Sequence, residues 1–248
     1  MSNPNVIAVS TYGPIIINVH DRFIGRSILQ TGYWANNDIE LIKQLVSFLL
    51  TKKDTLNFYD VGANIGTHAL AISKSFGVKV KVRAFEAQRN IFHMLCGTVA
   101  INGLYNIYCH NSAVSDQCGK KIIIPLPDYH ASNNFGGLEL IPAVNTDNQN
   151  FKNIGFDEVE TVTLDSFNED VDFIKIDIEG MEDKALSGSK LIFERSRPIV
   201  FIEVAKTDLN FVTNFFRRRE YCGFLSAGDL VAIPTEFEIH LNGIERFF

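Results

Sequence analysis

Cysteine is scarce in this chain, and no two cysteines stand close together. Structural zinc sites and dithiol redox motifs place their cysteines about two to four residues apart, so the spacing argues against both. Reduced, structural thiols are expected, as in a cytoplasmic protein. The four cysteines are Cys96, Cys109, Cys118 and Cys222.

Long apolar runs are also missing. No run approaches the roughly 20 residues that a membrane-spanning helix needs. The N-terminal residues Ser2-Asn3-Pro4-Asn5 lack the basic-then-apolar order of a signal peptide. We therefore expect a soluble, cytoplasmic protein with no membrane partner.

Positive charge is in deficit. Lys and Arg number 23 against 29 Asp and Glu, which gives a formal net charge of −6. A protein with this balance has no general attraction to a phosphate backbone. Nucleic acid is therefore not an expected partner.

What the chain does contain is a regular alternation of strand and helix patterns. From Leu56 onward, short apolar runs alternate with helical periodicity, which predicts βαβ units around a parallel sheet. With 248 residues, 46% of them apolar, the chain can form one large core. We expect an N-terminal extension at 1–50 and one α/β domain at 51–248.

The pattern also predicts individual elements. Expected strands are 56–61, 79–85, 105–110, 171–176 and 199–204, with an added strand at 120–125 and a terminal hairpin at 223–239. Expected helices are 67–76, 88–101, 181–195 and 209–220. The extension should hold a strand pair around 15–24 and a helix at 38–50. Periodicity disappears between 127 and 160, which is typical of a functional or disordered loop.

A glycine turn joins the first of these strands to its helix. Gly62 and Gly66 let the backbone turn tightly and come close to a ligand. A dinucleotide site would need a third glycine and no carboxylate near the phosphates, whereas Asp60 stands just before this turn. A cationic amino-acid ligand suits the segment better. The residues expected at the ligand are Asp60, Gly62, Ala63, Asn64, Gly66 and Thr67.

A second acidic residue ends the next strand. Glu86, which is followed by Ala87, can accept hydrogen bonds from both hydroxyls of a ribose. Ser112 and Ala113 follow the third strand and can contact an adenine edge. The glycine turn and the strand-end acid together favour a nucleoside ligand.

Two blocks of residues resemble the FkbM methyltransferase family. The first is the segment DVGANIG, from Asp60 to Gly66, with Phe85-Glu86. The second is Thr163-Leu164-Asp165, then DFIKIDIEGME from Asp172 to Glu182, then Gly188 and the strand from Pro198 to Glu203. The resemblance covers about Asn57 to Val204.

The resemblance implies a class I methyltransferase, Rossmann-like α/β fold. Its seven-stranded sheet would be mostly parallel, with helices on both faces and the last strand antiparallel. It also implies S-adenosylmethionine as the cofactor and methylation of a hydroxyl on a sugar, a glycan or a small natural product. Asp60, Gly62 and Gly66 would surround the methionine part of the cofactor, and Glu86 would bind its ribose.

Three carboxylates are expected where an acceptor would bind. The carboxyl ends of parallel strands meet at one edge of the sheet, so Asp177, Glu179 and Glu203 should converge there. Either Asp177 or Glu179 acts as a general base with a raised pKa while the other orients the acceptor, or the acids share a divalent cation. We favour the base, because no ligand spacing diagnostic of a metal is present.

The polar loop at 127–160 supplies one more candidate base, His130. Tyr129 and Phe135 in the same loop could stack on a sugar or close an internal core. Two other functions stay open. Ala35 stands where many relatives carry an acidic residue, which permits a catalytically inactive module that binds S-adenosylmethionine. A nicotinamide-dependent oxidoreductase would be recognised by its affinity for NAD.

Overall fold

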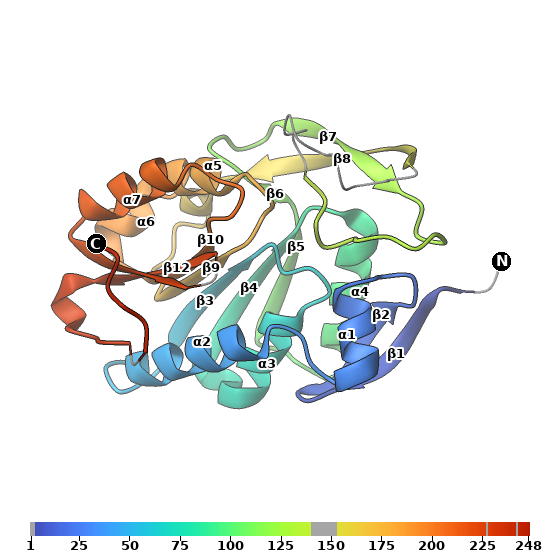
Figure 1. Ribbon diagram of the computed structural model, residues 1–248, viewed down its shortest axis with the longest axis horizontal. Helices are drawn as coiled ribbons and strands as arrows, with labels where there is room; N and C mark the ends of the chain where they lie inside the picture. The colour runs from blue at the N-terminus through green and yellow to red at the C-terminus, as the bar shows by residue number, and fades with distance from the viewer. Residues whose placement is uncertain (1–2, 140–152, 227, 242) are drawn as a thin grey trace.

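A seven-stranded sheet forms the centre of the chain (Figure 1). The computed structural model describes residues 3–139, 153–226, 228–241 and 243–248. In spatial order the strands are β11 (Tyr221–Ser226), β12 (Asp229–Pro234), β10 (Ile199–Glu203), β9 (Phe173–Ile176), β3 (Leu56–Val61), β4 (Val80–Glu86) and β5 (Ile107–Asn111). β12 pairs antiparallel with both of its neighbours, and the other pairs are parallel. The predicted class I α/β fold is confirmed.

Helices cover both faces of this sheet (Figure 1). One face carries α2 (Asn36–Leu49), α3 (Thr67–Phe76) and α4 (Arg89–Ile101). The other carries α5 (Glu182–Ser187), α6 (Lys190–Arg195) and α7 (Leu209–Arg217). Successive strand residues point to opposite faces, so Phe58 packs with the first set and Tyr59 with the second.

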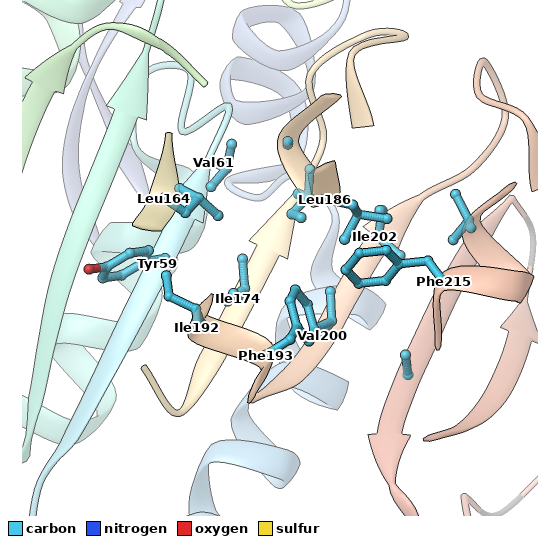
Figure 2. Packing of buried hydrophobic residues seen from close by; sticks show 14 of the residues in the cluster. Tyr59, Val61, Leu164, Ile174, Leu186, Ile192, Phe193, Val200, Ile202 and Phe215 are labelled. Atoms are coloured by element: carbon cyan, nitrogen blue, oxygen red, sulfur yellow. The ribbon is translucent and has the colours of Figure 1, made fainter. Parts of the chain in front are cut away.

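The core beneath α5, α6 and α7 is rich in aromatic and branched side chains. Figure 2 shows Ile174, Val200 and Ile202 of the sheet beside Phe193 and Phe215 of the helices. The rings of Phe193 and Phe215 meet edge to face with centroids 5.0 Å apart. Each such buried side chain contributes about 1.5–3 kcal/mol relative to its exposed state, which makes the sheet a rigid base for its loops.

Two smaller units flank the sheet. The hairpin of β1 (Asn5–Ser10) and β2 (Gly13–Asn18), with α1 (Ile24–Thr31), lies against α4. There the Ile16 amide donates to Thr98 Oγ1 over 3.1 Å. A second sheet has the order β6 (Ala113–Val114), β8 (Asn153–Val162), β7 (Lys121–Pro127). Short 3₁₀ turns are η1 (Gly77–Lys79), η2 (Leu164–Phe167) and η3 (Thr235–Phe237).

Several predicted elements need correction. The N-terminal strand pair lies at 5–18 rather than 15–24, and α1 was not predicted. The stretch at 127–160 ends in β8, which pairs with β7 as an antiparallel partner; residues 140–152 lie outside the described chain. The predicted helix at 181–195 is split into α5 and α6 around Gly188, where the chain passes so close to another segment that a Cβ would lie 2.2 Å from the Ser115 carbonyl oxygen. Among the described residues, no helix has both the length and the apolarity to cross a membrane.

Candidate active site

The glycine turn brings β3 and β9 into close contact. Gly62 has φ 77° and Gly66 has φ 93°, conformations that favour glycine. A Cβ built on Gly62 would lie only 1.8 Å from the Asp177 carbonyl oxygen. A side chain at this position is therefore excluded both by the backbone conformation and by the neighbouring strand.

A pocket opens at the carboxyl ends of β3, β4, β5, β9 and β10. Eleven of the predicted site residues line it: Gly62, Ala63, Asn64, Thr67, Glu86, Ala87, Ser112, Ala113, Asp177, Glu179 and Glu203. Three predicted residues, Asp60, Gly66 and His130, are not among the described residues that line it.

Glu86 is held in place by backbone amides. Its Oε2 accepts from the Asn64 amide over 2.9 Å, and its Oε1 accepts from the Gln88 amide over 2.8 Å. Burial raises the pKa of Glu86 to about 7, although both amides oppose that shift. The carboxylate is therefore oriented before any ligand arrives, and each oxygen keeps a lone pair for a ribose hydroxyl.

Asp60, which was predicted at the cofactor, is buried and does not line the pocket. Its side chain is fully buried, and neither carboxylate oxygen has a hydrogen-bond partner among the described residues. The ammonium of Lys175 is 3.5 Å from Asp60 Oδ1. Asp60 therefore lies behind Lys175, which does line the pocket. This corrects the prediction of direct ligand contact for Asp60.

The structure adds Lys175 to the site. This lysine stands in β9 with only 3% of its side chain exposed. Its Nζ donates to the Gly62 carbonyl over 2.8 Å and lies 3.6 Å from Asp177 Oδ2. Burial acts to lower the pKa of Lys175, but the Asp177 and Asp60 carboxylates outweigh it, so the pKa is raised and the side chain stays charged.

The three predicted acids do converge. Asp177, Glu179 and Glu203 each offer a carboxylate oxygen, and these oxygens lie within 4.8 Å of one another. Burial, followed by the charges of Asp177 and Glu179, raises the pKa of Glu203 to about 8. Glu179 adopts φ 57° and forms an ion pair with Lys206. The same oxygens could hold a divalent cation, so geometry alone permits both predicted arrangements.

Two further acids extend this negative region. Asp38, in the first turn of α2, has its pKa raised by burial and then by Asp177. Burial, with Asp38 and Asp177, raises the pKa of Asp229 to about 7. The segment that leads from Trp34 into α2 therefore lies on the Asp177 side of the pocket.

Two further segments complete the lining of the pocket. The N-terminal segment, here called the wall, contributes Phe23, Ile24 and Trp34, and the segment after β7, here called the roof, contributes Asn134, Gly136, Gly137 and Leu138. The roof is fixed by Gln88, whose Nε2 donates to the Phe135 carbonyl over 2.7 Å.

Two aromatic residues of the roof belong to the core. Phe135 is 1% and Tyr129 8% exposed, and their rings lie 4.7 Å apart. They close an internal core rather than present a stacking surface. His130 is exposed on the same segment, which corrects its prediction as a base at the acceptor.

The comparisons with known proteins agree with this geometry. The sequence profile of the Methyltransferase FkbM domain matches residues 60–226. The chain belongs to the FkbM methyltransferase family. The match confirms the predicted resemblance and, at the level of the family, the prediction of S-adenosylmethionine as cofactor. It also decides against the nicotinamide alternative.

A solved structure shares the fold. The methyltransferase FkbM from Methylobacillus flagellatus KT superposes with a TM-score of 0.51 at 19% identity, over 72% of this chain and 44% of that one. The chain thus spans less than half of that protein's length. A SAM dependent methyltransferase from Aquifex aeolicus gives a TM-score of 0.41 at 17% identity, over 80% of this chain and 98% of that one. M. jannaschii TYW2 in complex with AdoMet gives a TM-score of 0.44 at 14% identity, over 94% of this chain and 84% of that one. A search of curated proteins found no match.

The FkbM motif residues divide into structural and pocket-lining positions. Asp165 accepts from the Leu191 and Ile192 amides and so caps α6. Asp172 accepts from the Asn57 amide, which fixes β9 beside β3. Glu182 accepts from the Ile178 and Gly180 amides and shapes the turn after β9. Asp177 and Glu179 are left to face the pocket.

The pocket of this FkbM domain fits the cofactor. Gly62, Asn64, Glu86 and Ser112, here called the cofactor half, combine a close backbone turn with an oriented carboxylate. His68 also lines this half. Burial, together with the Lys175 charge, lowers the pKa of His68 to about 3, so the ring is neutral. The lone lysine within the apolar strand of the motif was the available signal for Lys175.

Proposed function

We propose that this chain transfers a methyl group from S-adenosylmethionine to a hydroxyl of a sugar, a glycan or a small natural product. The observation that supports the proposal is the position of Asp177, Glu179 and Glu203, here called the acceptor half. They line the same pocket as the glycine turn, and Gly62 touches the backbone of Asp177.

The cofactor, when bound, supplies an electrophilic methyl group on a sulfonium. Displacement at that carbon depends mainly on holding the acceptor oxygen in line with the sulfur. Residues at or just after the ends of β9 and β10 suit this task because the packed sheet fixes where these strands end. The geometry needed is therefore provided by strand ends rather than by long loops.

Glu203 is the best candidate for the base. Its Oε2 is buried and has no hydrogen-bond partner among the described residues, and its raised pKa matches proton removal near neutral pH better than that of an ordinary carboxyl. Asp177 and Glu179 would then orient neighbouring hydroxyls. This reassigns the base, which the sequence pattern had placed on Asp177 or Glu179.

The charge of the pocket favours neutral acceptors. Its acceptor half is acidic, and Asp38 and Asp229 reinforce it. A phosphorylated acceptor would be repelled at this rim. A polyhydroxylated molecule can donate hydrogen bonds to the carboxylates.

The test is a methyl-uptake screen with labelled S-adenosylmethionine over neutral sugars, lipid-free glycans and natural-product alcohols, read by mass spectrometry. For an accepted compound, Glu203→Gln should lower kcat by about 10²- to 10⁴-fold while the Kd for S-adenosylhomocysteine stays nearly unchanged. Glu158→Gln, an exposed change on β8, is the matched control and should keep full turnover.

Two outcomes would contradict the proposal. Equal losses of binding and turnover in Glu203→Gln would remove Glu203 from the chemistry. Tight S-adenosylhomocysteine binding with no methylated product across the screen would favour the inactive binding module instead.

A further inference from the structure

The charges that line the pocket are strongly unequal. Among the described lining residues, four are carboxylates, namely Glu86, Asp177, Glu179 and Glu203, and Lys175 is the one cation. His68 cannot add a second cation, because it is neutral. Lys175 is therefore the one cationic partner that the described lining offers to an anionic part of a ligand, and the other donors there are neutral.

The cofactor brings such an anionic part. Its methionine end is an α-amino acid with a carboxylate, and transfer of an unpaired carboxylate into a buried, acidic pocket is costly. The glycine turn is where this end is expected, and Lys175 touches that turn through the Gly62 carbonyl.

The Lys175 ammonium has hydrogen-bonding capacity left. An ammonium has three N–H donors, and one of them makes the 2.8 Å bond to Gly62. Its other contacts, to Val61 O, Asp60 Oδ1 and Asp177 Oδ2, measure 3.4, 3.5 and 3.6 Å. These are longer than the roughly 2.7–2.9 Å of charge-assisted hydrogen bonds.

We propose that Lys175 binds the carboxylate of the methionine end of the cofactor. Asp60, behind it, keeps the lysine charged and in place, so the buried pair acts as a carboxylate receptor beneath the glycine turn. The inference rests on the S-adenosylmethionine site of the proposed function and does not depend on the acceptor.

The test compares three ligands by calorimetry on the full chain. S-adenosylhomocysteine has both the carboxylate and the amine, its decarboxylated analogue has only the amine, and 5′-methylthioadenosine has neither. Lys175→Met should weaken S-adenosylhomocysteine by about tenfold or more, as expected for loss of a charge-assisted bond. The other two ligands should change by no more than about twofold. Lys121→Met, on the exposed side of β7, removes the same charge and should change none of the three.

Different outcomes of this experiment would contradict the role of Lys175 or the cofactor site itself. Similar losses for all three ligands in Lys175→Met would mean that the lysine only shapes the turn, and no loss for S-adenosylhomocysteine would also overturn the proposal. Failure of the wild-type chain to bind any of the three would instead remove the cofactor site itself.

Folding of the variant can be controlled. Loss of Lys175 leaves Asp60 as an uncompensated buried charge, so Asp60→Asn with Lys175→Met is the second variant. The ratio of two affinities on one preparation is independent of the folded fraction. If neither variant folds, the affinities of the wild-type chain for S-adenosylhomocysteine and for its decarboxylated analogue are compared. Equal affinities for the two ligands would overturn the proposal.

Discussion

The cofactor half and the acceptor half of the pocket are built in different ways. The cofactor half comes from one continuous stretch, residues 61–114, and its carboxylate is held by two backbone amides. The acceptor half, Asp177, Glu179 and Glu203, follows two strands of the sheet, and its residues act on one another, and on Asp38 and Asp229 from distant segments, mainly through charge. Substitutions should therefore act sterically in the first half and electrostatically in the second.

The largest effect is expected at the contact between the halves. Gly62→Ala would place a Cβ against the Asp177 carbonyl in a left-handed backbone conformation. We expect S-adenosylhomocysteine binding to be abolished and stability to fall by about 2 kcal/mol or more, measured by calorimetry and by denaturant unfolding. Gly155→Ala is the control, because nothing lies within 4 Å of its Cβ position. Unchanged binding in Gly62→Ala would mean that the halves are not rigidly joined.

An intermediate effect is expected from pH on the acceptor half. Because the pKa of Glu203 is about 8, kcat/KM should fall about tenfold per unit as pH drops below 8. This fall in kcat/KM below pH 8 should be absent in Glu203→Gln. If that variant keeps the same fall, the titrating group is another residue.

The Glu203 carboxyl also makes the free energy of unfolding depend on pH. Its folded pKa of about 8 exceeds the ordinary 4.5, so the protonated form stabilises the fold. This contribution is fully present below pH 4.5 and is lost as pH rises through 8. Between pH 5 and pH 9, the Tm of Glu203→Gln should therefore fall less than the Tm of the wild type.

The smallest effect is expected from removal of divalent cations. If Glu203 is the base, chelation by EDTA should change the initial rate by no more than about twofold, because Lys175 and Lys206 already balance part of the negative charge. A rate that collapses and returns with added Mg²⁺ would show that the three carboxylates serve as metal ligands.

The same contrast explains what the sequence could predict. The cofactor half depends on a local pattern, a strand followed by a glycine turn and then a strand-end acid, so Gly62, Asn64 and Glu86 were found at the pocket. The convergence of Asp177, Glu179 and Glu203 followed from the rule that parallel strands end at one edge.

The misses depended on contacts between distant segments. The pairing of β7 with β8 and the helix break at Gly188 against Ser115 are such contacts. The local pattern placed Asp60 at the ligand but could not show that its side chain is fully buried beside Lys175. The choice among the acids required burial, which raises the pKa of Glu203 in particular.

Trp34 gives this pocket a built-in reporter. It is the one tryptophan in the chain, and it stands in the wall of the pocket. Intrinsic emission under selective excitation therefore arises from a single position beside the acidic rim. Entry of a molecule can be followed without a label, and candidate compounds can be ranked by fluorescence before any methylated product has been identified.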